Sequence, residues 1–331
     1  MNALEVVLVG AGRIAVGNHG LAGATPLSHL AAIRDVGAQI AVLRALVEPN
    51  EDARERARAD WPEVAAAECA PDMADLPDLK GAVAVICTPS SVRRNPVEAA
   101  IRGGALAVVV EKPLAQTADE ARALHAAAKA AGVPLVVNYN RRFDARIADA
   151  MRRGCEDVRS AELRYARGLW NYASHMLDLL VSRCGPIETV QWIAGACPDA
   201  AADANPSFAL TFRSGIPVAA LGHEGLDYDL LDLVLTTRAG RLRLLTGGAE
   251  IAVDAPQDDL HYKGYRHLAT GPAERGAAAG FSGLYRALHD WLVGGLAFVG
   301  CDSAQAVHLA EAFEAISVSA SRNGASIRLG D

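Results

Sequence analysis

The first 140 residues alternate short apolar runs with helical patterns, and this alternation constrains the fold more than any other feature. The apolar runs lie at residues 6–9, 40–47, 82–87, 107–110 and 135–137. The clearest helix spans residues 117–131, where Thr117 and Glu120 have the spacing of a capping box. Continuously apolar strands are typical of parallel sheets that helices cover on both faces. We therefore expect a doubly wound α/β sheet, a Rossmann domain, over residues 1–140.

The pattern changes after residue 140. Strand-like runs follow at residues 158–166, 187–194, 208–212, 217–222, 230–236, 241–245 and 250–253. Helical patterns lie at 145–153 and 174–182, and two more close the chain at 283–293 and 304–321. Alternating strands with hairpin-like turns between some of them predict an antiparallel sheet. Residues 141–331 are thus expected to form an α+β domain, whose last helices can pack back on the first domain.

Composition narrows the possible functions. A net charge of −7 and a pI near 5.7 argue against general binding to nucleic acids or membrane surfaces. No apolar stretch approaches the length of a membrane span, and no signal peptide precedes the first strand. The six cysteines are scattered without zinc-site spacing. We expect a cytoplasmic protein with reduced thiols, no metal site, and neither a nucleic-acid nor a membrane partner.

The first apolar run leads directly into Gly10-Ala11-Gly12-Arg13-Ile14-Ala15. A glycine pair between a strand and a helix lets the backbone approach a pyrophosphate, and the helix N-terminus supplies N–H groups. This G-x-G-x-x-A spacing predicts a nucleotide site that includes Gly10, Gly12, Arg13 and Ile14. A purely structural turn is the alternative.

Glu48 follows the second apolar run, where a carboxylate can accept hydrogen bonds from the adenine ribose hydroxyls. The same carboxylate would repel a 2′-phosphate, so NAD is favoured over NADP. A solvated loop carboxylate is the alternative. A phosphate could bind to Arg54, Arg56 and Arg58. The simpler interpretation is that these arginines form the solvent-exposed face of a helix.

Two further strand ends point to the same crevice. Thr88-Pro89-Ser90 follows one apolar run, and Glu111-Lys112-Pro113 follows the next. Ligands of open parallel sheets bind outside the carboxyl ends of the strands, so these segments should converge with the glycine turn. Lys112 is one of four lysines, whereas the chain has 28 arginines. Placing an ammonium at the end of a buried strand costs desolvation free energy, which suggests that the lysine has a function. A nicotinamide cofactor with a lysine near its reactive end is therefore expected.

Residues 17–25 carry three glycines where the first helix should continue. They predict an insertion over the cofactor crevice or, equally well, a surface loop.

Taken in order, these motifs resemble the Gfo/Idh/MocA family, the glucose–fructose oxidoreductase and inositol dehydrogenase group. The resemblance covers nearly the whole chain and rests on residues 9–15, 88–90, 111–115, 138–143 and 174–180. It implies a Rossmann domain followed by an open antiparallel sheet that binds substrate. It also implies homodimers or homotetramers built through that sheet, and a small, sugar-like substrate.

The resemblance further implies roles for single residues. Lys112 would hold the reacting oxygen, His175 would move its proton, and Asn171 completes the catalytic set. The implied cofactor-binding residues are those of the glycine turn and Glu48, together with Thr88, Pro89, Ser90, Glu111, Lys112 and Asn140. The expected substrate set is Lys112, Arg142, Trp170, Asn171, His175 and Lys263.

Asn171 departs from the pattern of inositol-type dehydrogenases, which have an aspartate four residues before the histidine. On a helix this offset puts both side chains on one face. An amide cannot take a proton, but it can form a hydrogen bond with a substrate hydroxyl or acetamido group. Asparagine at this position looks similar to the branch of the family that acts on nucleotide-linked sugars. Trp170 could stack on a sugar or pack in the core. Lys263 could meet a phosphate or lie in a solvated loop.

The resulting hypothesis is an NAD-dependent oxidoreductase that transfers a hydride between nicotinamide and a carbinol or ketone of a sugar, nucleotide sugar or polyol. A base of near-neutral pKa suits the carbinol proton, and a cation stabilises the developing alkoxide. Two alternatives stay open. One is an enzyme with tightly bound NAD that uses transient oxidation for epimerisation, elimination or glycoside cleavage, and the other is a non-catalytic NAD-binding regulator.

Overall fold

The computed structural model describes residues 3–17, 25–154, 156–197, 203–277 and 280–330. The chain divides into two compact units, each made of two segments. Unit 1 comprises residues 1–143 and 279–307, and unit 2 comprises residues 144–278 and 308–331. The division into domains 1–140 and 141–331 stays a prediction. Of the predicted insertion at 17–25, residues 18–24 lie outside the described residues.

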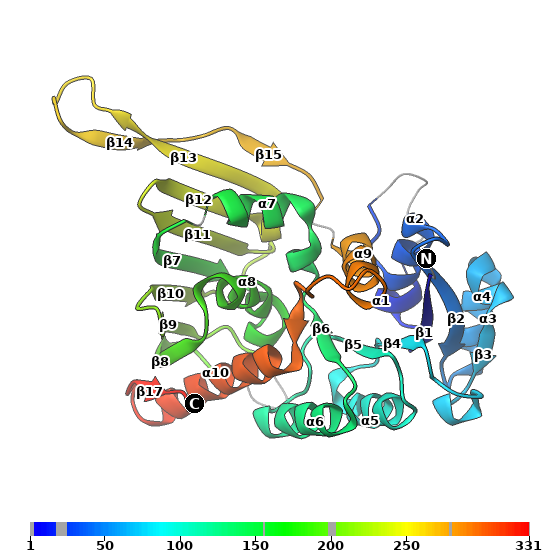
Figure 1. Ribbon diagram of the computed structural model, residues 1–331. Coiled ribbons are helices and arrows are strands. Elements are labelled where there is room, and N and C mark those ends of the chain that lie inside the picture. The colour runs from blue at the N-terminus through cyan, green and yellow to red at the C-terminus, as the bar shows by residue number, and fades with distance from the viewer. Residues whose placement is uncertain (1–2, 18–24, 155, 198–202, 278–279, 331) are drawn as a thin grey trace. The chain divides into compact units, whose positions relative to one another are not determined.

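Unit 1 is built around a seven-stranded sheet in the order β16-β6-β5-β4-β1-β2-β3 (Figure 1). Strands β1 to β6 run parallel, whereas β16 is antiparallel to β6. The strands are β1 (Leu4–Val9), β2 (Ala41–Val47), β3 (Glu68–Ala70), β4 (Ala82–Ile86), β5 (Ala107–Glu111), β6 (Leu135–Asn138) and β16 (Cys301–Asp302). Every residue of β4 and β5 is buried, as strands covered on both faces must be. The predicted doubly wound sheet is confirmed.

Helices cover both faces of this sheet. They are α1 (Arg13–Val16), α2 (His29–Val36), α3 (Glu51–Asp60), α4 (Pro62–Ala66), α5 (Arg94–Arg102), α6 (Ala118–Ala131) and α9 (Phe281–Leu292). Helices α2 and α9 pack together on one face, and α5 and α6 pack together on the other (Figure 1). The Thr117 side chain accepts a hydrogen bond from the Glu120 N–H, which fixes the predicted start of α6.

Unit 2 holds a ten-stranded sheet in the order β14-β13-β12-β11-β7-β10-β9-β8-β17, with β15 also paired to β13. The strands are β7 (Val158–Tyr165), β8 (Ile187–Ala194), β9 (Ser207–Phe212), β10 (Pro217–Gly222), β11 (Leu231–Thr237), β12 (Gly240–Leu245), β13 (Glu250–Asp258), β14 (Arg266–Ala269), β15 (Ala273–Arg275) and β17 (Ile327–Arg328). The predicted antiparallel sheet is confirmed, except that β10 and β7 pair in parallel. The long connection between these two strands makes the parallel pairing possible.

Helices of unit 2 cover one face of its sheet. They are α7 (Ala145–Gly154), α8 (Ser174–Cys184) and the unit-2 part of α10 (Ser303–Ser321) (Figure 1). Strand β10 buries Val218 and Ala220 and turns Ala219 and Leu221 the other way, to solvent. In the described part of unit 2, the second face of the sheet carries no helix.

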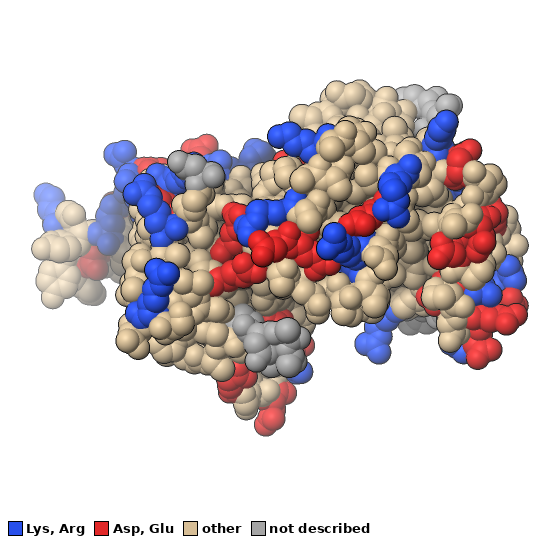
Figure 2. All heavy atoms as spheres, turned by 90° about the horizontal axis from the view of Figure 1, so that it is seen from below, with Lys and Arg blue, Asp and Glu red and all other residues tan. Residues whose placement is uncertain are grey.

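Charged side chains of both signs are intermixed on the face shown in Figure 2. Helices α5 and α6 contribute exposed ion pairs such as Arg94–Glu98 at 2.8 Å and Arg122–Asp119 at 2.5 Å. Pairs of this kind contribute about 1 kcal/mol or less each. None of the described helices combines the length and the apolar character that crossing a membrane demands.

Candidate active site

The glycine turn joins β1 to α1 and leaves its backbone open. Gly10 has φ +97°, and a Cβ there would lie 3.3 Å from the carbonyl carbon of Cys87. A Cβ at Gly12 would meet nothing within 4 Å. A ligand can therefore approach the main chain at Gly12 closely, as pyrophosphate binding requires.

Glu48 holds this turn in place. Its carboxylate accepts a hydrogen bond from the Ala11 N–H at 2.8 Å and another from the Asn50 N–H at 2.9 Å. Arg54 on α3 donates to the carbonyl oxygens of Glu48 at 2.6 Å and Pro49 at 3.0 Å. The carboxylate thus links the end of β2 to the glycine turn, and Arg54 stiffens the same loop.

A cavity of about 590 Å³ lies outside the carboxyl ends of β1, β2, β4 and β5. It brings together most residues predicted to contact the cofactor, namely Gly10, Gly12, Arg13, Ile14, Glu48, Thr88, Pro89, Glu111 and Lys112. Ser90 and Asn140 are half-buried and are not among its lining residues. The strand ends of unit 1 therefore meet at one crevice.

Thr88 presents an unsatisfied polar atom beside this cavity. Its Oγ1 is buried and has no hydrogen-bond partner among the described residues. A buried hydroxyl without a partner is costly, so a polar ligand group placed there would lower the free energy. The open glycine backbone, the Glu48 carboxylate and this hydroxyl together fit a dinucleotide.

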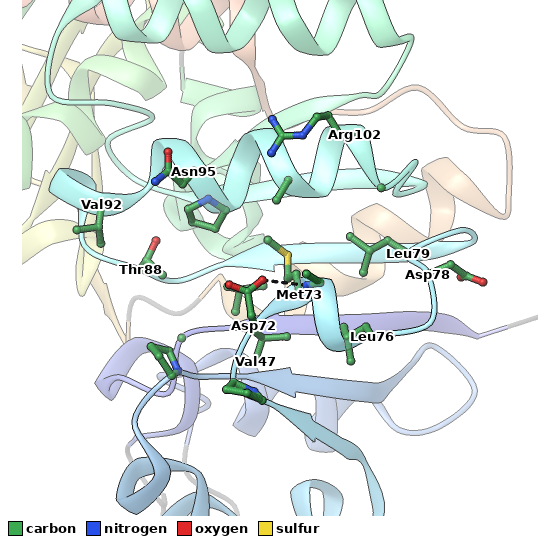
Figure 3. A pocket seen from close by; sticks show the side chains of 18 of the residues that line it. Val47, Asp72, Met73, Leu76, Asp78, Leu79, Thr88, Val92, Asn95 and Arg102 are labelled. Carbon is green, nitrogen blue, oxygen red and sulfur yellow. Dashed lines mark hydrogen bonds between the residues drawn. The ribbon is translucent and has the colours of Figure 1, made fainter.

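A second cavity, of about 770 Å³, adjoins the first and shares Gly10, Pro49, Thr88 and Val92 with it. Figure 3 shows the apolar side chains that line it, among them Val47, Met73, Leu76 and Leu79. Asp72 accepts a hydrogen bond from the Ala74 N–H at 2.9 Å and so orders the loop after β3. The result is a mostly apolar space next to the glycine turn.

The Glu111 side chain is held inside unit 1. Its Oε1 accepts hydrogen bonds from His29 Nε2 at 2.9 Å and from Asn138 Nδ2 at 2.7 Å. His29 Nδ1 in turn lies 3.0 Å from the Tyr285 hydroxyl on α9. Burial opposes ionisation, yet these bonds and the charges of His29 and Lys112 hold the pKa of the Glu111 carboxyl below its usual value.

Two residues near Lys112 were missed from the sequence. His29 is fully buried on α2, and Arg93 is only 4% exposed at the start of α5. A histidine on the apolar face of a short helix gives a weak signal, and Arg93-Arg94 has the pattern of surface charge. Neither pattern reveals the partners, which come from distant parts of the chain.

His175 lies in unit 2, whereas Lys112 lies in unit 1. Helix α8 is buried on all sides from Ser174 to Val181, and His175 is 7% exposed. Such enclosure on every side is typical of a central helix.

Asn171 precedes α8 on a π-helical turn, Leu169–Ala173. The Asp203 carboxylate accepts hydrogen bonds from the Trp170 N–H at 2.9 Å and the Asn171 N–H at 2.8 Å. The exposed Asn171 amide donates to the Arg167 carbonyl at 3.3 Å. Because backbone bonds in a π turn span five residues, the four-residue offset from Asn171 to His175 lacks the regular α-helical geometry that we assumed.

The remaining predicted substrate residues lie on separate elements of the two units. The Trp170 ring packs edge-on against Phe313, with 4.8 Å between centroids. Arg142 is buried in unit 1, in a short turn after β6. Lys263 is exposed in the hairpin that joins β13 to β14, which projects away from α8 (Figure 1). The described residues contain no group of three or more His, Cys, Asp or Glu arranged to hold a metal ion.

Residues 4–139 match an oxidoreductase family, Gfo/Idh/MocA, described as having an NAD-binding Rossmann fold. The matched segment contains the glycine turn and the strand ends that line the first cavity. The match confirms the resemblance for residues 4–139, which are similar to the NAD-binding domain of this family, and it supports NAD as the cofactor. Compared by sequence, the chain matches no curated protein.

Solved structures share the fold over the whole chain. The WlbA dehydrogenase from Bordetella pertussis, in complex with NADH and UDP-GlcNAcA, is 21% identical with a TM-score of 0.76, covering 100% of this chain and 99% of its own. Levoglucosan dehydrogenase, in complex with NADH and L-sorbose, is 16% identical with a TM-score of 0.78 and full coverage of both chains. Aldose-aldose oxidoreductase from Caulobacter crescentus, complexed with glycerol, is 18% identical with a TM-score of 0.77, covering 99% and 100%. At these identities the similarity shows the fold.

Proposed function

We propose that this chain is an NAD-dependent dehydrogenase or reductase acting on a CH–OH group of a sugar, nucleotide sugar or polyol. The observation that carries the proposal is the cavity in which the glycine turn, Glu48, Thr88 and Lys112 meet. The substrate class is supported by structures of similar fold that hold UDP-GlcNAcA or L-sorbose together with NADH.

The two adjoining cavities suggest how the cofactor lies. The main chain of Gly10 and Gly12 would hold the pyrophosphate, and the apolar second cavity would accept the adenine ring. Glu48 meets the adenine ribose and disfavours a 2′-phosphate, so NAD is the cofactor in preference to NADP. The Thr88 hydroxyl, which lacks a partner among the described residues, would donate a hydrogen bond to the dinucleotide.

The chain supplies the acid–base chemistry. NAD, when bound, would supply the hydride acceptor or donor for the carbinol carbon. His175 receives the hydroxyl proton, and the Lys112 ammonium stabilises the negative charge that develops on the oxygen. Asn171 bonds a polar substituent of the substrate.

The test is turnover with NAD and a panel containing UDP-GlcNAcA, inositol, L-sorbose and glycerol, followed by the absorbance of reduced nicotinamide. Lys112→Ala and His175→Ala should each lower kcat/KM by roughly 10²- to 10⁴-fold. Lys129→Ala, which removes an exposed lysine of α6, is the matched control. Unchanged turnover in both site variants would refute the assigned roles.

The same assay separates the two alternatives. Product formed without net accumulation of NADH indicates transient oxidation by a retained cofactor. A single turnover on any substrate of the panel excludes a non-catalytic regulator.

We also propose that the second sheet face of unit 2 pairs with another copy of the chain. Leu221 is 43% exposed there, Ala219 is exposed beside it, and Val234 is half-buried on β11. Apolar side chains on an uncovered sheet face mark a contact surface.

A further inference from the structure

Arg93 is a buried cation whose hydrogen bonds within the described part of the chain go to main-chain carbonyl oxygens. Its Nε and Nη2 donate to the Thr88 carbonyl at 3.1 and 2.6 Å. Its Nη1 donates to the Glu111 carbonyl at 2.5 Å and also to the Pro113 carbonyl. One guanidinium therefore ties together the loops that follow β4 and β5.

These carbonyls frame the part of the crevice where chemistry is proposed. Glu111 and Pro113 are the chain neighbours of Lys112 on either side. Thr88 carries the buried unsatisfied hydroxyl and lines the same cavity as Lys112. Arg93 itself lines that cavity. Its bonds thus set the spacing between the Lys112 main chain and Thr88.

Burying this guanidinium has a free-energy cost. Burial lowers the pKa of Arg93, and the nearby Glu111 carboxylate opposes that change. A planar fork with five N–H donors can bridge three carbonyls in fixed geometry, whereas a lysine offers a single point charge. Such a cost is expected at a site where a functional group must be positioned to within a fraction of an ångström.

A second clamp acts on the same strand end. The Glu111 carboxylate is bonded to His29 and Asn138, so the residue before Lys112 is held by both its side chain and its carbonyl. The main chain is therefore fixed on both sides of Lys112, by Arg93 at Pro113 and by three groups at Glu111.

We propose that Arg93 is a positioning residue for Lys112, fixing the main chain that presents the Lys112 ammonium to the cofactor cavity in register with Thr88. This inference rests on the proposed function, in which Lys112 faces the reacting oxygen. Arg93 itself touches no reacting atom.

The small number of lysines allows a direct test without a known substrate. Reductive methylation with ¹³C-formaldehyde places an NMR label on the four lysines and keeps their charge. Lys112→Arg identifies the Lys112 signal, and NADH is the added ligand. Arg93→Gln removes the clamp without adding an amine, and Arg94→Gln is the control because Arg94 is an exposed partner of Glu98.

In the wild type and in Arg94→Gln, NADH should shift the Lys112 signal. In Arg93→Gln, NADH should still bind, as measured by its fluorescence, but the Lys112 shift should fall to less than half. Once a substrate is identified, kcat should fall by about 10- to 100-fold while KM changes little, because misplacing a catalytic group by about 1 Å can cost 10²-fold.

Each outcome has a distinct meaning. A full Lys112 shift in folded, NADH-bound Arg93→Gln overturns the role of Arg93 and leaves the proposed function standing. No Lys112 shift in the wild type at saturating NADH overturns the placement of Lys112 instead. If Arg93→Gln does not fold, hydrogen exchange of the wild type decides: residues 88–92 and 111–116 should open together, and independent opening overturns the proposal.

Discussion

Replacing His29 by leucine should destabilise unit 1 in a way that depends on pH. In the native chain His29 donates to the buried Glu111 carboxylate at 2.9 Å and packs edge-on against Phe281, with 5.1 Å between ring centroids. Leucine fills much of the space but offers no donor. Of its two side-chain donors among the described residues, the Glu111 carboxylate, 7% exposed, then keeps Asn138 at 2.7 Å.

The magnitude follows from the fate of that charge. Removing the hydrogen-bond partner of a buried carboxylate should cost about 3–5 kcal/mol, as for a broken buried pair, since the carboxylate charge stays buried. With roughly 2–4 °C of melting temperature per kcal/mol for a domain of this size, unit 1 should melt about 6–20 °C lower.

The loss of stability in the variant should depend on pH through the pKa of Glu111. In the wild type the pKa of Glu111 is lowered, so its contribution is present above the unfolded value of about 4.3 and is lost as pH falls through the folded-state pKa. Without His29, burial dominates and raises the pKa of Glu111. A raised carboxyl pKa favours the folded state at low pH and loses that contribution as pH rises. The variant should therefore lose more stability at about pH 8 than at about pH 5.

Urea unfolding followed by circular dichroism at both pH values measures the effect. His125→Leu is the control, because His125 Nδ1 bonds the Ser303 hydroxyl at 2.8 Å rather than a carboxylate, and its loss should not depend on the ionisation of Glu111. The double variant His29→Leu/Glu111→Gln should recover much of the loss at about pH 8, since the orphaned charge is gone. An equal loss at both pH values, or no recovery in the double variant, would refute the reasoning.

Three further changes have definite expected outcomes. Glu48→Gln should move the ratio of NADPH to NADH affinity toward NADPH by roughly tenfold or more, as read by calorimetry, because the 2′-phosphate no longer meets a carboxylate; an unchanged ratio would count against the ribose assignment. Gly10→Ala should cost about 1–2 kcal/mol and weaken NADH binding, whereas Gly81→Ala, at φ +76° with nothing near its Cβ, should cost stability alone. Leu221→Glu should lower the mass measured by light scattering, and an unaltered mass would contradict an interface on that sheet face.

Much of the fold was predictable because continuous apolar runs in the first part of the chain give way to alternating runs in the second. Strands β4 and β5 are buried throughout, and that is what a continuous apolar run encodes. Strands β16 and β17 have two residues each and are defined by their pairing with β6 and β8, respectively. No local sequence pattern could predict them. The parallel pairing of β10 with β7 likewise depends on a long connection and on no local sequence pattern.

The candidate site divides in the same way. Gly10, Thr88 and Lys112 could be brought together from sequence because parallel topology places the ends of β1, β4 and β5 at one edge. His29 could not, since its partner Glu111 is 82 positions away and nothing in either segment specifies the pairing. The local geometry at Asn171 was also hidden, because Asp203, 32 positions further on, holds that turn.

The return of residues 279–307 to unit 1 has a consequence for biosynthesis. A nascent chain that has emerged only as far as residue 143 possesses six of the seven strands, but it lacks α9 to cover α2 and β16 to close β6. An uncovered apolar helix face and an open strand edge invite aggregation. The nucleotide-binding unit must therefore wait, partly formed, until residues 279–307 have left the ribosome.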